Sequence, residues 1–236
     1  GKDFSVTKID DTGLWFGSYP AHANDIQSIR QHGIKAVLNV QTEAELALRE
    51  IDIKKIQATC AQCQIQFMRL PLKENDEGEY AFDLFRICQK INQIVEVEKK
   101  GPLLVHCSSG VTRSPTVALT YLCIFKKIED WDNPHGFSNY LRVLNPKIFP
   151  NMSVVNRTIN NNQNFIDRQK FKGGRKSTST NNKIQITESS PPKSPLKSAR
   201  DKALKANIKV NTSELNQTMG RKQQETDLNY ETSSEK

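Results

Sequence analysis

A short apolar segment, Leu103 to His106, is followed at once by a loop and then by a long apolar helical pattern. Its sequence, LLVH, is the kind of continuous apolar run found in strands that are buried on both faces of a sheet. Such a strand requires helices on both faces, and strand-like and helix-like patterns do alternate along most of the chain. We therefore predict an α/β fold: a single domain with a central, mainly parallel sheet flanked by helices.

The alternation of strand and helix patterns extends from residue 14 to residue 166. The predicted strands cover 14–16, 35–40, 65–70 and 103–106. The predicted helices cover 22–31, 52–63, 80–98, 112–126, 134–144 and 151–166. Within the third of these helices, apolar side chains recur at steps of three and four residues, which places them on one face: Phe82, Phe85, Cys88, Ile91 and Val95.

The positive charge of the chain is concentrated toward its C-terminal end. The formal net charge is +8, yet residues 1–167 carry 19 basic and 19 acidic side chains. Residues 168–236 carry 15 basic and 7 acidic side chains, and 172–236 contain no Phe or Trp, too little apolar surface to offset the entropy of ordering. We therefore predict a neutral globular domain over 1–167 and a basic, Ser-, Thr-, Asn- and Lys-rich disordered tail over 168–236.

This charge distribution argues against a nucleic-acid-binding fold, because the folded part is neutral. We hypothesise that the basic tail makes weak contact with anionic surfaces. Ser190 and Ser194 each precede a proline, as sites of proline-directed phosphorylation do. No apolar run is long enough to cross a bilayer, which excludes an integral membrane protein. The chain begins at Gly1 rather than Met, so residues upstream of this sequence are an expectation.

The chain has five cysteines and no visible secretory signal, which favours free thiols in a reducing, cytoplasmic compartment. Cys60 and Cys63 have the spacing of a zinc half-site, but no second Cys or His pair follows at ligand spacing. We therefore expect these two thiols to pack inside the domain. Cys88 and Cys123 are also expected to be core residues.

The stretch VHCSSGVTRSP, from Val105 to Pro115, combines residue types that suit phosphate chemistry. Backbone amides of a loop that leads into a helix can form a concave anion site, and the helix N-terminus adds partial positive charge. An arginine at the start of the helix can bind two oxygens of a phosphoryl group at once, and the same positive field stabilises a thiolate. The sequence therefore predicts Cys107 as a nucleophile, with Arg113 and the loop residues as phosphate ligands: Ser108, Ser109, Gly110, Val111 and Thr112.

His106-Cys107, five loop residues and then Arg113-Ser114 resemble the signature of cysteine-based protein tyrosine phosphatases, and GVTRSP resembles their dual-specificity branch. The resemblance covers roughly residues 13 to 166. It implies a two-step hydrolysis of phosphate monoesters, in which Cys107 forms a phosphocysteine that water then breaks. It also implies that Ser114 assists departure of the thiolate, that His106 orients the loop and tunes Cys107, and that no metal or other cofactor is required.

This family supplies its general acid as an aspartate on a loop about thirty residues before the cysteine. Here the region RLPLKENDEGEY places Asp76 31 residues before Cys107, after a predicted strand and before a predicted helix. Asp83 is the alternative, but it falls inside the predicted helix. We therefore predict Asp76 as the acid of the first step and the base of the second.

Two substrate classes follow from different parts of the sequence. The segments FGSYP, VLNVQTEAEL, IDIKKIQA and PTVALTYL resemble glucan phosphatases, namely laforin and the plant starch-excess enzymes. Those enzymes have the loop pattern C-x-A-G-x-G-R, whereas this chain has Ser109 and Thr112 at the Ala and Gly positions. Thr112 instead suits the C-x-x-G-x-S/T-R-S pattern of phosphoprotein phosphatases. We therefore predict dephosphorylation of phosphotyrosine and of phosphoserine and phosphothreonine in proteins, with a phosphorylated glucan as the alternative substrate.

A third interpretation is a phosphate-binding pseudoenzyme or scaffold, although Cys107, Arg113 and Asp76 are all present. We expect a monomer. The sequence leaves open whether Cys88 or Cys123 forms a reversible disulfide with Cys107, as happens in some relatives.

Overall fold

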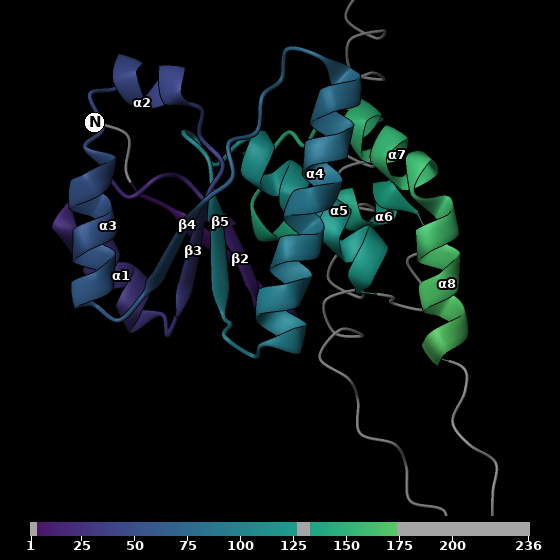
Figure 1. The fold of residues 1–236 in the computed structure, drawn as a ribbon, viewed down its shortest axis with the longest axis horizontal. Coiled ribbons are helices and arrows are strands. Elements are labelled where there is room, and N and C mark those ends of the chain that lie inside the picture. The colour runs from purple at the N-terminus through teal and green to yellow at the C-terminus, as the bar shows by residue number, and fades with distance from the viewer. Residues whose placement is uncertain (1–3, 127–132, 174–236) are drawn as a thin grey trace, which may run out of the picture. The chain divides into compact units, whose positions relative to one another are not determined.

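The computed structural model describes residues 4–126 and 133–173, and within these ranges five strands form a single sheet (Figure 1). The strand order is β1-β2-β5-β3-β4, with β1 antiparallel to β2 and every other neighbouring pair parallel. The mainly parallel sheet confirms the predicted fold class. The strands are β1 (Val6–Ile9), β2 (Leu14–Gly17), β3 (Ala36–Asn39), β4 (Gln66–Arg69) and β5 (Leu103–His106).

Helices cover both faces of this sheet (Figure 1). On one face lie α1 (Ala23–Gln31) and α3 (Ile53–Gln62). The other face is covered by helices that follow β4 and β5: α4 (Glu77–Asn92), α5 (Arg113–Phe125), α6 (Pro134–Leu144), α7 (Met152–Asn161) and α8 (Gln163–Gly173). A short helix, α2 (Glu43–Leu48), lies beyond the end of β3, and a π-helical turn, η1 (Gln93–Val97), extends α4. The central strand β5 is therefore buried from both sides, as its apolar sequence predicts.

Four elements of the fold differ from the sequence-based expectation. Strand β1 and helix α2 were not expected, because each is short and neither shows a clear apolar period over its four or six residues. The helix expected over 80–98 begins earlier, at Glu77, and ends in the π-helical turn. The helix expected over 151–166 is divided at Asn162 into α7 and α8.

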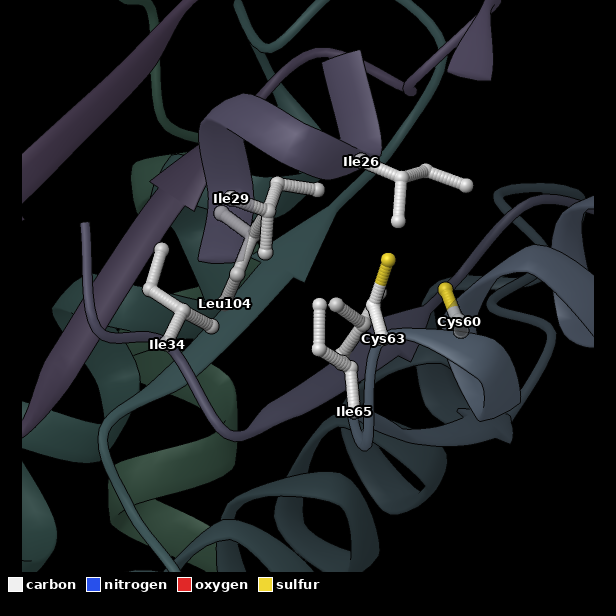
Figure 2. Packing of buried hydrophobic residues seen from close by; sticks show 8 residues of the cluster. Ile26, Ile29, Ile34, Cys60, Cys63, Ile65 and Leu104 are labelled. Atoms are coloured by element: carbon white, nitrogen blue, oxygen red, sulfur yellow. The ribbon is translucent and has the colours of Figure 1, made fainter. Parts of the chain in front are cut away.

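A cluster of buried side chains joins α1 and α3 to the sheet (Figure 2). Cys60 and Cys63 belong to this cluster, so both thiols pack inside the domain as expected. Burial raises the pKa of the Cys60 thiol to about 11, with Cys63 adding to the effect, so Cys60 stays protonated at neutral pH. The remaining members are Ile26, Ile29, Ile34, Val37, Ile65 and Leu104.

The boundary expected after residue 167 falls inside α8, which continues to Gly173. The rest of the expected tail, with Ser190 and Ser194, lies outside the described residues. Among the helices that the structure describes, none combines the length and the apolar character needed to cross a membrane.

Truncation of Leu104 to alanine is expected to destabilise the domain by about 3 kcal/mol, because this fully buried side chain of β5 would leave a cavity. Leu48→Ala is the matched control, since Leu48 is 84% exposed on α2 and its truncation should change the free energy of unfolding by less than about 0.5 kcal/mol. Urea unfolding followed by circular dichroism measures both. Equal losses in the two variants would contradict the assigned core.

Candidate active site

The neighbouring strands β2, β5 and β3 end at the same edge of the sheet. The predicted loop after β5 therefore lies between the segments that follow β2 and β3. His106 at the end of β5 is in register with Gly17 at the end of β2 and with Asn39 at the end of β3. The chain leaves β5 at Cys107 and enters α5 at Arg113. The loop after β5 is therefore bordered by the segments that follow β2 and β3, at the edge where open α/β sheets usually bind ligands.

Cys107 lies at the base of this loop, and the whole residue is only 2% exposed. The backbone N–H of Gly110 donates to Sγ at 3.3 Å, and the Ser114 hydroxyl oxygen lies 3.4 Å from Sγ. The Ser114 hydroxyl also donates to the carbonyl of Gly17 at 2.9 Å. Because a hydroxyl carries one proton, Ser114 can turn that proton from the Gly17 carbonyl to the sulfur when a thiolate forms there.

Gly110 allows the loop to approach the end of β2 closely. Its φ is +74°, and a Cβ at this position would lie 2.7 Å from backbone atoms of Gly17 and Ser18. Ser18 also forms an isolated antiparallel bridge with Ser109. Any other residue at 110 would therefore combine backbone strain with a clash, which explains why the loop requires glycine here.

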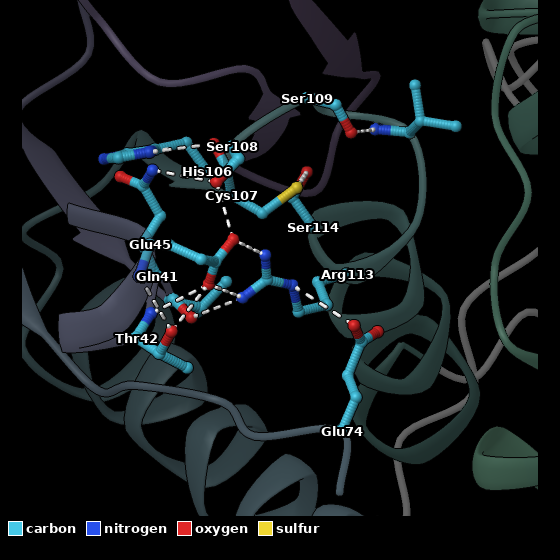
Figure 3. A network of polar contacts seen from close by, with 12 residues as sticks. Gln41, Thr42, Glu45, Glu74, His106, Cys107, Ser108, Ser109, Arg113 and Ser114 are labelled. Atoms are coloured by element: carbon cyan, nitrogen blue, oxygen red, sulfur yellow. Dashed lines mark hydrogen bonds and ion pairs between the residues drawn. The ribbon is translucent and has the colours of Figure 1, made fainter. Parts of the chain in front are cut away.

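The guanidinium of Arg113 is paired with the carboxylate of Glu45 from α2 (Figure 3). Nη1 donates to Oε2, Nη2 donates to Oε1, and Nη1 also donates to the carbonyl of Val40 at 3.4 Å. The Arg113 side chain is only 11% exposed. Burial disfavours its charge, but the hydrogen bonds and charge of Glu45 raise the pKa of Arg113, so the guanidinium stays protonated.

Glu45 is held by several donors in addition to Arg113. Thr42 donates its backbone N–H and its hydroxyl to Oε2, each at 3.0 Å, and Ser108 donates its hydroxyl to Oε1 at 2.7 Å. The Ser108 hydroxyl in turn accepts from the Gln41 amide at 2.9 Å. Burial alone would raise the pKa of Glu45, but hydrogen bonds from Arg113, Thr42 and Ser108 outweigh it and lower that pKa to about 2.

The other predicted phosphate ligands have defined partners within the fold. The Val111 N–H donates to the Ser109 hydroxyl at 3.3 Å, and the Val111 carbonyl accepts from Phe149 N–H at 2.8 Å. Thr112 is the residue before the first turn of α5, and its carbonyl accepts from Thr116 N–H at 3.0 Å. The predicted ligands therefore lie on one loop around Cys107, while the Ser108 side chain is directed to Glu45 instead of into the loop.

His106 is fully buried directly before the nucleophile candidate. Its Nδ1 lies 3.4 Å from the carbonyl oxygen of Cys107. Burial lowers the pKa of His106 to about 4, and its contact with that carbonyl offsets only part of the effect. The imidazole is therefore neutral at physiological pH, and its contact with the Cys107 carbonyl involves no ionic charge.

Asp76 occupies the N-cap position of α4 and is exposed. Its Oδ1 accepts from the backbone N–H of Glu79 at 2.7 Å. Within the described residues, no hydrogen bond or ion pair joins Asp76 to Cys107 or Arg113. Asp83, the alternative acid, lies inside α4 as the sequence indicated.

Sequence reasoning missed three residues of this site: Gln41, Glu45 and Glu74. Glu74, from the loop that also carries Asp76, places Oε2 3.8 Å from Nε of Arg113 (Figure 3). A capping-box pattern, Thr42-x-x-Glu45, marks the start of α2 and could have identified that helix. No pattern in the sequence indicates Glu74, because its contact with Arg113 joins distant segments.

The remaining cysteines lie away from this network. All five cysteines are free in the structure. Cys88 donates to the carbonyl of Val117 at 3.7 Å, and burial raises its pKa well above the usual value. Burial likewise raises the pKa of Cys123 to about 12. Both thiols therefore stay protonated between α4 and α5.

Comparison with known proteins identifies the domain that contains this site. The model of the family described as "Dual specificity phosphatase, catalytic domain" matches residues 14–168. A probable dual specificity protein phosphatase of Dictyostelium discoideum is 30% identical over 159 residues, which are 66% of this chain and 63% of that protein. The amyloplastic phosphoglucan phosphatase DSP4 of Castanea sativa is 26% identical over 110 residues, 46% of this chain and 29% of that protein.

A solved structure of similar fold is the crystal structure of PTPMT1, with a TM-score of 0.54 and 18% identity. The match covers 71% of this chain and 99% of that one. At this level of identity the likeness concerns the fold. The chain spans less than two thirds of the length of the curated relatives described above.

Replacement of Glu45 by glutamine is expected to change how the stability of the domain depends on pH. The pKa of Glu45 is about 2 when folded against an ordinary 4.5, so its stabilising contribution is complete above pH 4.5 and is lost as the pH falls toward 2. Between pH 5 and pH 2 the wild type should therefore lose about 2–3 kcal/mol more of its free energy of unfolding than Glu45→Gln.

Urea unfolding at several pH values measures this difference. Glu43→Gln is the matched control, because Glu43 is the exposed carboxylate on the same helix, and it should follow the wild type. Parallel pH curves for the wild type and Glu45→Gln would show that Glu45 is not held as an ionised partner of Arg113.

Proposed function

The chain belongs to the dual specificity phosphatase family, and from this premise we propose that it hydrolyses phosphate monoesters of proteins through a phosphocysteine intermediate. The observation that carries the proposal is the surroundings of Cys107. Its sulfur has an amide N–H at 3.3 Å and a hydroxyl at 3.4 Å, on a loop that leads into α5 at Arg113. These neighbours can stabilise a thiolate and a phosphoryl group at one place.

In the proposed first step, the Cys107 thiolate attacks phosphorus in line with the leaving oxygen. A sulfur–phosphorus bond forms, the phosphorus–oxygen bond breaks, and Asp76 in its protonated form gives its proton to the leaving oxygen. Arg113 binds two of the phosphoryl oxygens and offsets the charge that they carry.

In the proposed second step, water displaces the cysteine sulfur from phosphorus. Asp76, now a carboxylate, takes a proton from that water, which becomes the fourth oxygen of the released phosphate. Ser114 donates its hydroxyl proton to the departing thiolate as a hydrogen bond. Neutral His106 holds the Cys107 carbonyl and so keeps the loop in place.

Two observations support a phosphoprotein rather than a glucan as the substrate. Ser109 and Thr112 replace the Ala and Gly of the glucan-phosphatase loop pattern. Stacking on sugar rings requires exposed aromatic side chains, and Phe16 and Tyr80 are instead buried. Trp15 packs partly buried against the α1–α3 cluster. The name of the Dictyostelium relative agrees with the protein substrate.

A phosphorylated glucan remains the second candidate function. The Castanea relative is named as a phosphoglucan phosphatase. Phe82 on α4 is 63% exposed and is available to stack on a sugar ring. The two candidates share the same chemistry and differ in what surrounds the phosphate.

Parallel phosphate-release assays on a phosphopeptide pool and on solubilised phosphorylated glucan test the substrate. We expect release mainly from the peptides, including phosphotyrosine and phosphoserine or phosphothreonine peptides, and none from Cys107→Ser. Release mainly from glucan would replace the proposed substrate by the second candidate. No release from either would favour a phosphate-binding pseudoenzyme.

Replacement of Asp76 by asparagine tests the acid without removing the helix cap. Asparagine retains a side-chain oxygen that can accept from Glu79 N–H, so α4 should keep its start, but it cannot donate a carboxylic acid proton. We expect kcat to fall by about 10²- to 10⁴-fold with an alkyl phosphate and far less with nitrophenyl phosphate, whose leaving group needs no proton. An equal fall with both substrates would show that Asp76 is not the acid.

A further inference from the structure

The hydrogen-bonding groups of Arg113 are divided between two edges of its guanidinium. A guanidinium carries five N–H groups. Both N–H groups of Nη1 are used, by Glu45 and by the carbonyl of Val40, and one N–H of Nη2 is used by Glu45. The two that remain, on Nε and Nη2, point along the same edge. This edge is the one left for two oxygens of a substrate phosphate.

Glu74 lies at that remaining edge. Its Oε2 is 3.8 Å from Nε of Arg113, whereas Glu45 faces the Nη1–Nη2 edge (Figure 3). The two carboxylates therefore contact different sides of one cation. A tetrahedral dianion bound at the Nε edge would have to take the place of Glu74 or lie directly against its negative charge.

The two carboxylates also differ in how firmly they are held. Glu45 is 23% exposed and has donors from Thr42 and Ser108 besides Arg113. Glu74 is 47% exposed, and within the described residues its one ion pair is with Arg113. The loop of Glu74 is fixed to the sheet through Leu72, whose N–H donates to the Val40 carbonyl at 3.0 Å. Glu74 can therefore leave Arg113 by rotation of its side chain alone.

From this geometry we propose that Glu74 is an internal competitor of the substrate phosphate for Arg113, and so sets the affinity of the site for phosphorylated ligands. The inference rests on the proposed function, because it uses Arg113 as the phosphate ligand. In the ligand-free protein Glu74 neutralises the open edge of Arg113. When a phosphate binds, Glu74 turns toward solvent and its attraction to Arg113 is lost.

The proposal predicts opposite effects from removing the two carboxylate charges. Glu74→Gln is expected to bind a tetrahedral dianion about three- to fivefold more tightly than the wild type, the range that an exposed ion pair can supply. Glu45→Gln is expected to bind it more weakly, because Arg113 loses the partner that orients it. If the two carboxylates acted only through their negative charge, and not through their different positions on Arg113, removal of either charge would tighten the binding of the dianion.

Calorimetric titration of the full chain with tungstate measures this affinity without requiring turnover. Glu79→Gln is the matched control, since it removes an exposed carboxylate from the nearby first turn of α4, and its affinity should stay within about 1.5-fold of the wild type. In turnover of a phosphopeptide, Glu74→Gln should lower KM with kcat changed less than twofold.

Unchanged or weaker tungstate binding by Glu74→Gln would overturn the proposal, as would an equal gain in Glu79→Gln. Failure of the proposed function gives a different result. In that case phosphopeptides are not hydrolysed, while the order of tungstate affinities, Glu74→Gln above wild type above Glu45→Gln, still reports on the competitor.

Discussion

The ion pair between Arg113 and Glu45 joins two segments that lie 68 residues apart and fixes the geometry of the loop around Cys107. A guanidinium that is nine-tenths buried requires a charged partner, because an unpaired buried charge is strongly destabilising. Here that partner comes from the helix that follows β3, the strand directly beside β5. The adjacency of these two strands therefore decides which carboxylate can reach the loop.

Helix α2 and the loop stabilise each other through Glu45. Six residues are too few for a helix to be stable by itself, so α2 depends on its caps and on tertiary contacts. Glu45 closes the capping box with Thr42 and pairs with Arg113 through the same carboxylate. Loss of this one side chain would therefore remove a helix cap and a counter-charge together.

Local sequence patterns were sufficient to predict most of the fold and to indicate which residues lie together on the loop around Cys107. The order of strands and helices followed from apolar periodicity, and Cys107, Arg113 and Ser114 lie within eight residues of one another. Strand β1 and helix α2 were missed because each is too short to show a period. Glu45 and Glu74 were missed for another reason: their contacts with Arg113 depend on strand order, which no local pattern reports.

The arrangement around Arg113 also explains why this position needs arginine rather than lysine. A lysine ammonium carries its three N–H donors on one atom, so it cannot offer separate two-donor edges to a carboxylate and to a phosphate. A planar guanidinium presents two separate edges, and one can be kept permanently by a buried carboxylate while the other exchanges partners. Burial decides which carboxylate is permanent and which can be replaced. Glu45 is the more buried and is held by several donors, whereas Glu74 is about half exposed and can be replaced.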